Sequence, residues 1–145
     1  PDFSGASLRG TDFTGANLAG GSFVMADLGE AALYKANLFM ADLSGANLID
    51  ADLSEANLTQ ANLGPADIKD ANGDSTGRQW PANLTNADLS FAILEDSKMF
   101  SVNLRLAKLN NALLAGANLT GATTDGASFD GADVKMATLP DKITA

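Results

Sequence analysis

The 145-residue sequence contains no cysteine and no histidine, and aromatic residues make up only 6% of it. Without cysteine the chain has no disulfide framework, no thiolate zinc site and no thiol nucleophile. Without histidine it also lacks the commonest general base and metal ligand. No apolar run approaches the roughly 18 residues of a membrane-spanning helix, and no signal-peptide pattern is visible. We therefore expect a protein without enzymatic activity, cofactor or bound metal.

Basic residues are scarce as well. Nine Lys and Arg residues face eighteen Asp and Glu residues, which gives a net charge of −9. Residues 1–72 carry −7 of this charge, and no Lys or Arg occurs between Ala36 and Ile68. Direct binding to nucleic acid or to an anionic membrane depends on basic patches, so we expect neither. Because the first residue is Pro1 and not methionine, we expect a processed or trimmed chain, from which a leader could have been removed.

What the sequence has in abundance is a five-residue period, visible in ADLSGANLIDADLSEANLTQANL at residues 41–63. A large apolar residue, here called the centre, recurs at every fifth position from Phe3 to Ile68 and from Leu84 to Leu139, with Thr124 as the one polar exception. Alanine stands two places before twenty-one of these twenty-six centres, and the position directly before the centre is usually Asp, Asn, Ser or Thr. The periods of a helix, a strand and a heptad coiled coil do not fit this spacing.

Such a short, regular repeat indicates a solenoid, in which each coil contacts only its neighbours. Each five-residue unit must form a short extended run and a turn, so that the centre and the small alanine both point inward. Stacked coils then pair as parallel strands about 4.8 Å apart, which satisfies their backbone donors and acceptors.

The units ADLSG, ANLID, ADLSE, ANLTQ, ADLSF and ANLTG resemble the A-(D/N)-L-x-x signature of the pentapeptide-repeat family. The resemblance covers nearly the whole chain. It implies an all-β fold, a right-handed quadrilateral parallel β-helix with four units per twenty-residue coil and about seven coils. Two spacings in the sequence agree with such a coil: Phe3 and Phe23 would stack inside, and Asn17, Asn37 and Asn57 would form a ladder on one face.

The closing residues ATLPDKITA resemble the tail of cyanobacterial and plastid members of the family, some of which are thylakoid-lumen proteins. The resemblance leaves the compartment open between the cytoplasm, the thylakoid lumen and the periplasm.

The period breaks once. The centres stop at Ile68, or at Gly73 if this glycine is counted as a degenerate centre, and they resume at Leu84, one position out of register. The stretch ANGDSTGRQWP before Leu84 contains turn signals. We predict a first repeat block at 1–72, an interrupting loop at 73–81 with about residues 74–79 protruding, a second block at 82–140 and a tail at 141–145. Two distorted units with one inserted residue are the alternative.

Residues 73–77 also fit Gly-x-Ser-x-Gly, the nucleophile elbow of hydrolases, but the elbow needs a strand–turn–helix context and a base for the serine proton. We therefore assign this stretch to the loop. Arg78 and Trp80 are more informative, because Arg and Trp are enriched among the residues that dominate binding at protein interfaces. Trp80 either folds back over the wall as a lid or protrudes with Arg78.

Acidic residues of the first block would face solvent, because the position before each centre and the two after it point outward. One interpretation is structural, since Asp and Asn at turns hydrogen-bond their own backbone and acidic surfaces aid solubility. The other is DNA mimicry: residues 1–68 would carry about one negative charge per 2.3 Å of rod, against about 1.7 Å in duplex DNA. Family members that resemble DNA in this way bind type II topoisomerases, and they tend to have loops that protrude from the coil.

We predict a non-catalytic, rigid solenoid that acts as a scaffold or protein-interaction module. The residues expected to contact the partner are Asp42, Asp50, Asp52, Glu55, Asp67, Arg78 and Trp80. One alternative is an acidic DNA mimic that binds and regulates a type II topoisomerase such as gyrase. The other is a structural rod that forms homodimers through its coil ends, because no capping helix is visible at either end.

Overall fold

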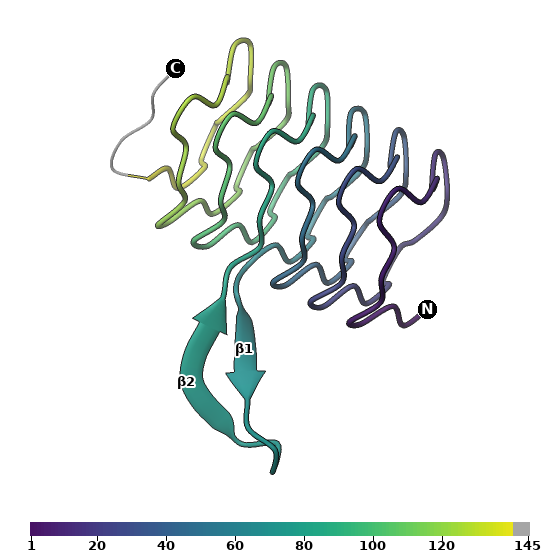
Figure 1. Cartoon of the computed structure of the whole chain (residues 1–145). Helices are drawn as coiled ribbons and strands as arrows, with labels where there is room; N and C mark the ends of the chain where they lie inside the picture. Colours follow the sequence, from purple (N-terminus) through teal and green to yellow (C-terminus); the bar gives the residue numbers. More distant parts are fainter. Residues whose placement is uncertain (141–145) are drawn as a thin grey trace.

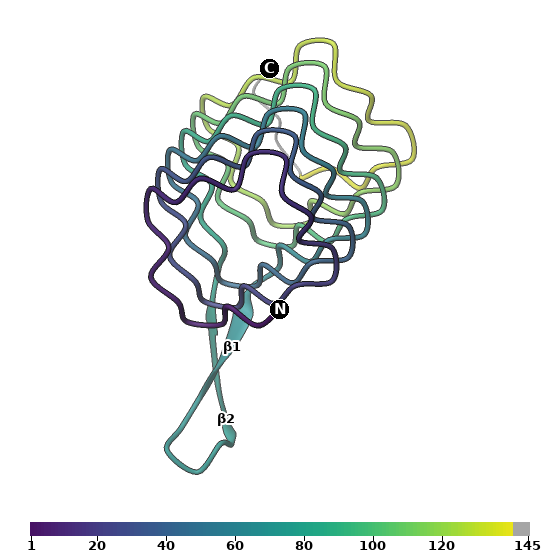
Figure 2. The ribbon, with the colours of Figure 1, turned by 90° about the vertical axis from the view of Figure 1, so that its right-hand side faces the viewer.

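The computed structural model describes residues 1–140, so the predicted tail at 141–145 lies outside the described residues. The chain winds into a rod of stacked coils, and one β-hairpin projects from the middle of this rod (Figure 1). The first and last coils lie at opposite ends of the rod. Viewed closer to its axis, each coil has four sides (Figure 2).

The coils are joined by parallel backbone pairing at a spacing of twenty residues. The residue before each centre pairs with its equivalent in the next coil, as Asp42 does with Asn62. The Phe23 N–H donates to the Asp42 carbonyl at 2.7 Å, and the Asp42 N–H donates to the Gly21 carbonyl at 2.9 Å. Each side of a coil is only one such pair wide. The two longer strands, β1 (Ala66–Lys69) and β2 (Ser75–Trp80), form the hairpin.

The corners of the coil are tight turns. Each is closed by a hydrogen bond to the carbonyl of the centre, such as the 3.0 Å bond from the Ala46 N–H to the Leu43 carbonyl. The residue two places after the centre has a positive φ, as the third residue of a type II turn does, whether it is Gly15 (φ 67°) or Glu55 (φ 57°). Within residues 1–140 one corner departs from this rule, and it is the corner from which the hairpin leaves.

The four sides of the coil are numbered in chain order by the centres that line them. Side 1 is lined by Phe3, Phe23, Leu43, Leu63, Met99, Leu119 and Leu139. Side 2 is lined by Leu8, Leu28, Leu48, Leu84, Leu104 and Thr124. Side 3 is lined by Phe13, Leu33, Leu53, Leu89, Leu109 and Phe129. Side 4 is lined by Leu18, Leu38, Leu58, Leu94, Leu114 and Val134.

The interior consists of these centres and the alanines beside them, as the repeat predicts. From the second coil to the fifth, the leucine centres and most of the alanines are fully buried. Between the first and second coils the rings of Phe3 and Phe23 stack with centroids 5.1 Å apart, and Phe13 meets both rings edge-on. On side 4 the Asn37 amide donates to the Asn17 amide oxygen at 3.3 Å, so these rungs of the predicted ladder are joined.

The parallel solenoid predicted from the repeat, with the four-sided all-β coil that the family resemblance implies, is therefore the fold. Within residues 1–140 the rod has twenty-five inward centres, which make six full coils and the first side of a seventh. The sequence indicated about seven coils because it assigned nearly the whole chain to the solenoid, whereas sixteen residues, Ile68 among them, are inserted at the hairpin.

Candidate interaction surface

The hairpin begins where the coil reaches Pro65. This proline stands two places after the centre Leu63, at the corner position that has a positive φ elsewhere in the rod. The proline ring fixes φ near −65°, so Pro65 is incompatible with the corner turn. The chain leaves the wall and returns at Ala82. Asn83 then pairs with Asn47, thirty-six residues earlier instead of twenty, so sixteen residues are inserted between side 1 and side 2.

The inserted segment is longer than the predicted interruption at 73–81. Its two strands run from Ala66 to Trp80, and residues 75–79 belong to β2 and not to an isolated loop. The stretch Ala66-Asp67-Ile68 has the spacing of a repeat unit, which is why the sequence assigned it to the first block. In the structure Ile68 pairs with Arg78 across the hairpin. Distorted repeat units, the alternative for this region, are not present.

Strand alternation gives the hairpin two faces. β1 and β2 are antiparallel, with Ile68 opposite Arg78 and Asp67 opposite Gln79, and cross-strand partners share a face. Because side chains alternate along a strand, Trp80, Arg78 and Ile68 lie on one face, and Asp67 and Gln79 lie on the other. Trp80 is 54% exposed, so it does not form a lid over the wall. Arg78 and Trp80 are thus brought together on a protruding surface.

The hairpin tip is held by its own hydrogen bonds. The Asp70 carboxylate accepts the N–H groups of Asn72 and Asp74 at 2.9 and 3.0 Å. The Thr76 hydroxyl donates to the Ile68 carbonyl at 2.6 Å, beside the β-bulge between Ile68 and Lys69. These contacts give the exposed hairpin a defined shape of its own.

The residues of the Gly-x-Ser-x-Gly motif form part of the hairpin. Ser75 is the first residue of β2, and its hydroxyl donates to the Asp67 carboxylate at 2.9 Å. No helix follows this strand in the described residues, whereas the nucleophile elbow requires a strand-to-helix turn. The motif therefore supplies turn and strand residues, with Gly77 at a positive φ of 77°.

The base of the hairpin packs against the corner at Gly45 in the preceding coil. A methyl group added to Gly45 would lie 2.7 Å from the Ala66 Cβ and 2.7 Å from the Met25 Sδ. Only glycine leaves room for the hairpin to close against the wall at this point. The hairpin is thus fitted to the rod and does not hang from a flexible linker.

The acidic residues predicted to bind a partner do not form one surface. Asp50, Asp52 and Glu55 lie in one coil, along side 3 and the corners before and after it, and Asp88 pairs with Asp52 in the next coil. We call these four residues the acidic cluster. Asp42 lies on side 1, across the coil from side 3. Asp67, Arg78 and Trp80 lie on the hairpin.

Several of these carboxylates also have local structural roles. Asp52 accepts the N–H of Ser54 at 3.0 Å, two residues on, and the same turn-capping bond recurs along the repeat. Asp50 accepts a hydrogen bond from the Asn86 amide in the next coil at 2.7 Å. The acidic residues therefore stabilise the coil, whatever else they bind.

Residues 1–140 contain no group of three or more Asp, Glu, His or Cys side chains arranged to hold a metal ion. Those residues also form no helix with the length and hydrophobicity needed to cross a membrane.

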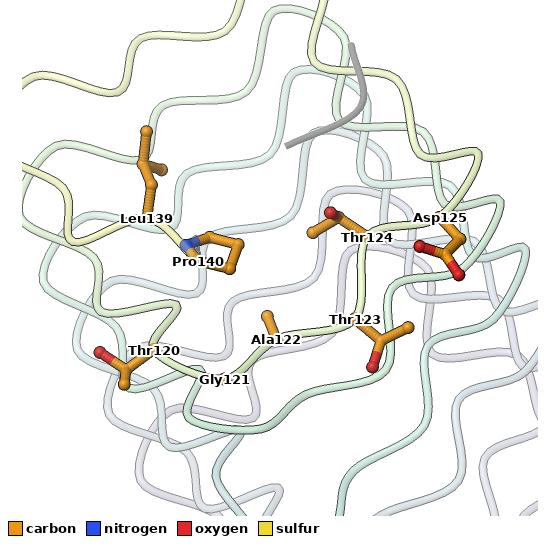
Figure 3. Close-up of a pocket in the computed structure, with 8 residues that line it drawn as sticks. All are labelled: Thr120, Gly121, Ala122, Thr123, Thr124, Asp125, Leu139 and Pro140. Atoms are coloured by element: carbon orange, nitrogen blue, oxygen red, sulfur yellow. The ribbon is translucent and has the colours of Figure 1, made fainter. Parts of the chain in front are cut away.

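A cavity of about 610 Å³ opens at the C-terminal end of the rod (Figure 3). Its lining includes Ala122, Thr124, Leu139 and Pro140. Thr124 stands where other units have a large apolar centre. The described part of the seventh coil contains one centre, Leu139. The cavity is therefore the coil interior seen through its open side, so we do not treat it as a ligand site.

The four-sided coil, the inward alanines and leucines and the five-residue period together define a right-handed quadrilateral β-helix. The family model of pentapeptide repeats matches eight copies in residues 2–33, 36–72 and 103–139. The chain belongs to the pentapeptide-repeat family. Among curated protein sequences, none is significantly similar to it.

One solved structure shows the same fold, and two further pentapeptide repeat proteins are similar in sequence. A trypsin-treated form of QnrB1, a plasmid-mediated fluoroquinolone resistance protein, matches with a TM-score of 0.63 and 24% identity, over 95% of this chain and 65% of that one. A pentapeptide repeat protein from the Arabidopsis thaliana thylakoid lumen is 33% identical over 83% of this chain and 59% of its own, with a TM-score of 0.46. A pentapeptide repeat protein from the cyanobacterium Cyanothece is 32% identical over 78% of this chain and 63% of its own, with a TM-score of 0.40. The chain thus spans about three fifths of the length of these relatives.

Proposed function

We propose that this chain is a non-catalytic interaction module that presents its hairpin to a protein partner. The observation that carries the proposal is the placement of Trp80 and Arg78 on one face of a hairpin that stands away from the rod (Figure 2). Exposed Trp and Arg side chains are the residue types that most often anchor an interface. A partner that buries Trp80 would gain a large apolar contact and a neighbouring cation for a carboxylate or an aromatic ring.

The rod supports this role by fixing the hairpin in place. Its coils are hydrogen-bonded to one another on all four sides, and the hairpin base is packed at Gly45. A binding surface held in advance loses little conformational entropy when a partner docks. The rest of the rod is then the scaffold that sets the position and orientation of the hairpin.

Site-specific photo-crosslinking tests the proposal. The full chain with p-benzoylphenylalanine in place of Arg78 is irradiated in a lysate of its own cell, and the matched control has the same group in place of Arg105, on the rod wall. We expect a defined protein to be crosslinked at position 78 and not at position 105. No crosslinked protein at position 78, or the same set at both positions, would contradict the proposal.

A second candidate function is regulation of a type II topoisomerase by DNA mimicry. The acidic cluster and the net charge of −9 favour it, because side 3 carries several negative charges close together. The family resemblance implies the same role for acidic members with protruding loops. The basic DNA-binding groove of a topoisomerase is the surface that such a cluster would occupy.

A gyrase supercoiling assay at two salt concentrations tests the second candidate. We expect inhibition or protection that weakens at high salt, because exposed charges are screened. A variant with D50N, D52N, E55Q and D88N should lose the effect, whereas D42N, which removes one charge on side 1, should retain it. No effect at concentrations on the order of tens of micromolar would discard this candidate.

A further inference from the structure

A groove lies between the hairpin and the wall, on the hairpin face opposite Trp80 and Arg78. Its volume is about 370 Å³, and Gln79 of β2 lines it from the hairpin side. The wall contributes Asn62, Gly64, Lys98, Phe100 and Ser101. The groove exists because Pro65 turns the hairpin out of the wall, so the corner at Phe100 and Ser101 in the following coil has no equivalent corner of the preceding coil stacked on it.

The wall of the groove places an amide and an ammonium group next to each other. Asn62 and Lys98 are partners in the parallel pairing, so their side chains are adjacent rungs about 4.8 Å apart. The Asn62 amide oxygen accepts the Gly64 N–H at 2.9 Å, which leaves the amide NH₂ group facing away from the turn. A side chain at Gly64 would stand between Asn62 and Phe100, and glycine keeps that space open.

These donors have no acceptor of their own. Among residues 1–140 the ion pairs are those of Arg9 with Asp27 and Glu30, so Lys98 has no carboxylate partner. Asp67, which pairs with Gln79 across the hairpin, accepts the Ser75 hydroxyl and does not line the groove. In an acidic protein, a lysine beside a groove that contains no lining carboxylate is a local positive site.

The lining chemistry identifies the group that fits. Lys98 provides a charged donor, and the amides of Asn62 and Gln79 and the hydroxyl of Ser101 provide neutral ones. Such a set matches the oxygens of a carboxylate, which bind most strongly to charged donors. Phe100 is 38% exposed and supplies an apolar wall for the methylene stem of the side chain.

We propose that this groove receives an Asp or Glu side chain of the partner that docks on the hairpin, an inference that rests on the proposed function. The hairpin would then be held on both faces, with Trp80 and Arg78 on one and a partner carboxylate in the groove on the other. The carboxylate comes from a protein and not from a nucleic acid, because a polyanion would be repelled by a chain whose net charge is −9.

The test is an NMR titration of the ¹⁵N-labelled full chain with the dipeptide Ac-Phe-Glu-NH₂ and its neutral analogue Ac-Phe-Gln-NH₂. We expect the glutamate peptide to shift the side-chain amides of Asn62 and Gln79 and the backbone signals of Lys98 and Ser101. Binding should be on the order of millimolar, as expected for a small ligand in an open groove. The glutamine peptide should bind at least about tenfold more weakly, because it cannot form the charge-assisted bonds.

Two lysine variants separate the groove from general charge attraction. K98Q should weaken the glutamate peptide about tenfold, and K108Q, at the equivalent position on side 3, should leave its affinity unchanged. The proposal is wrong if the shifts are absent, if K98Q binds as well as the wild type, or if both peptides bind equally. It is also wrong if inorganic phosphate at equal ionic strength displaces the peptide, because the groove would then be a general anion site.

The peptide titration and the crosslinking experiment fail independently. Peptide binding with no crosslinked protein at position 78 would support carboxylate binding in the groove and contradict the proposal that a protein partner docks on the hairpin. A crosslinked protein whose binding is unaffected by K98Q would support the interaction module and contradict the proposal that the groove binds a carboxylate of the partner.

Discussion

A methyl group added to Gly45 would lie 3.1 Å from the carbonyl oxygen of Trp80, so this corner of the wall and the end of β2 are in direct contact. The contact joins the repeating part of the molecule to the inserted part. Gly45 also has a positive φ of 65°, which the turn requires at this position. The turn favours glycine at this position without requiring it, because Glu55 has the same positive φ at its own corner, whereas the closeness of the hairpin does require glycine here.

Replacing Gly45 by alanine should reduce the free energy of unfolding by about 2–4 kcal/mol. About 1 kcal/mol comes from the left-handed backbone, and the remainder from displacing the hairpin base. The matched control is G15A, where φ is 67° but nothing lies within 4 Å of the new methyl group. It should lose only about 1 kcal/mol. Urea unfolding followed by the fluorescence of Trp80, the one tryptophan in the chain, measures both; equal losses would contradict the packing argument.

Ser97 should be replaceable by alanine with a gain in stability. It occupies the inward position that is usually alanine, is 1% exposed, and its hydroxyl has no hydrogen-bond partner. S97A removes this buried hydroxyl and should raise the free energy of unfolding by about 1 kcal/mol. S44A is the control, because the Ser44 hydroxyl donates to Asp42 and its loss should destabilise the protein. A destabilised S97A would show that the hydroxyl has a partner after all.

The cost of a cavity should depend on its place along the rod. Leu53 is fully buried in the third coil with coils on both sides, so L53A should cost about 3 kcal/mol. Leu8 is only partly buried in the first coil, and L8A should cost clearly less. In a solenoid each coil is stabilised by its two neighbours, which makes the first coil the weaker one. Similar losses from thermal or urea unfolding would argue against this nearest-neighbour picture.

The first coil should also respond to acid. The Thr14 hydroxyl and then the Thr14 backbone N–H, bonded to Asp12 at 2.9 Å, lower the Asp12 pKa below its ordinary value of 3.8. Because the folded pKa is the lower one, the stabilisation is present above pH 3.8 and is lost as the pH falls through the folded pKa. Replacing Thr14 by alanine should move the Asp12 pKa back toward 3.8 in an NMR titration of its carboxyl carbon. An unchanged pKa would mean that the hydroxyl does not act on Asp12.

The repeat was readable from the sequence because one short unit carries all the information that the coil needs. A centre such as Leu53 and an alanine such as Ala51 specify the inside, and the spacing of Phe3 and Phe23 agrees with the twenty-residue coil that the family resemblance implies. The hairpin was harder to place. Ala66-Asp67-Ile68 satisfies the repeat locally, and its exclusion from the coil depends on the residue before it.

That residue, Pro65, was the available signal. Once the corner position is known to need a positive φ, a proline there predicts that the wall is interrupted. The pairing of β1 with β2 could not be read in the same way, because antiparallel pairing depends on a turn at Asp70–Asp74 that has no repeat to compare with. The acidic residues were correctly expected on the outside, but their distribution over sides 1 and 3 requires the register of the coil.

The most direct test of the account is the affinity of the partner crosslinked at position 78 for three forms of the chain, measured by calorimetry. The forms are the wild type, R78A/W80A and the wall variant R105A. The account predicts a loss of at least about 30-fold for R78A/W80A, equivalent to the 2 kcal/mol that defines a hot spot, and no change for R105A. Equal affinity of all three folded forms would contradict the claim that the hairpin is the binding surface.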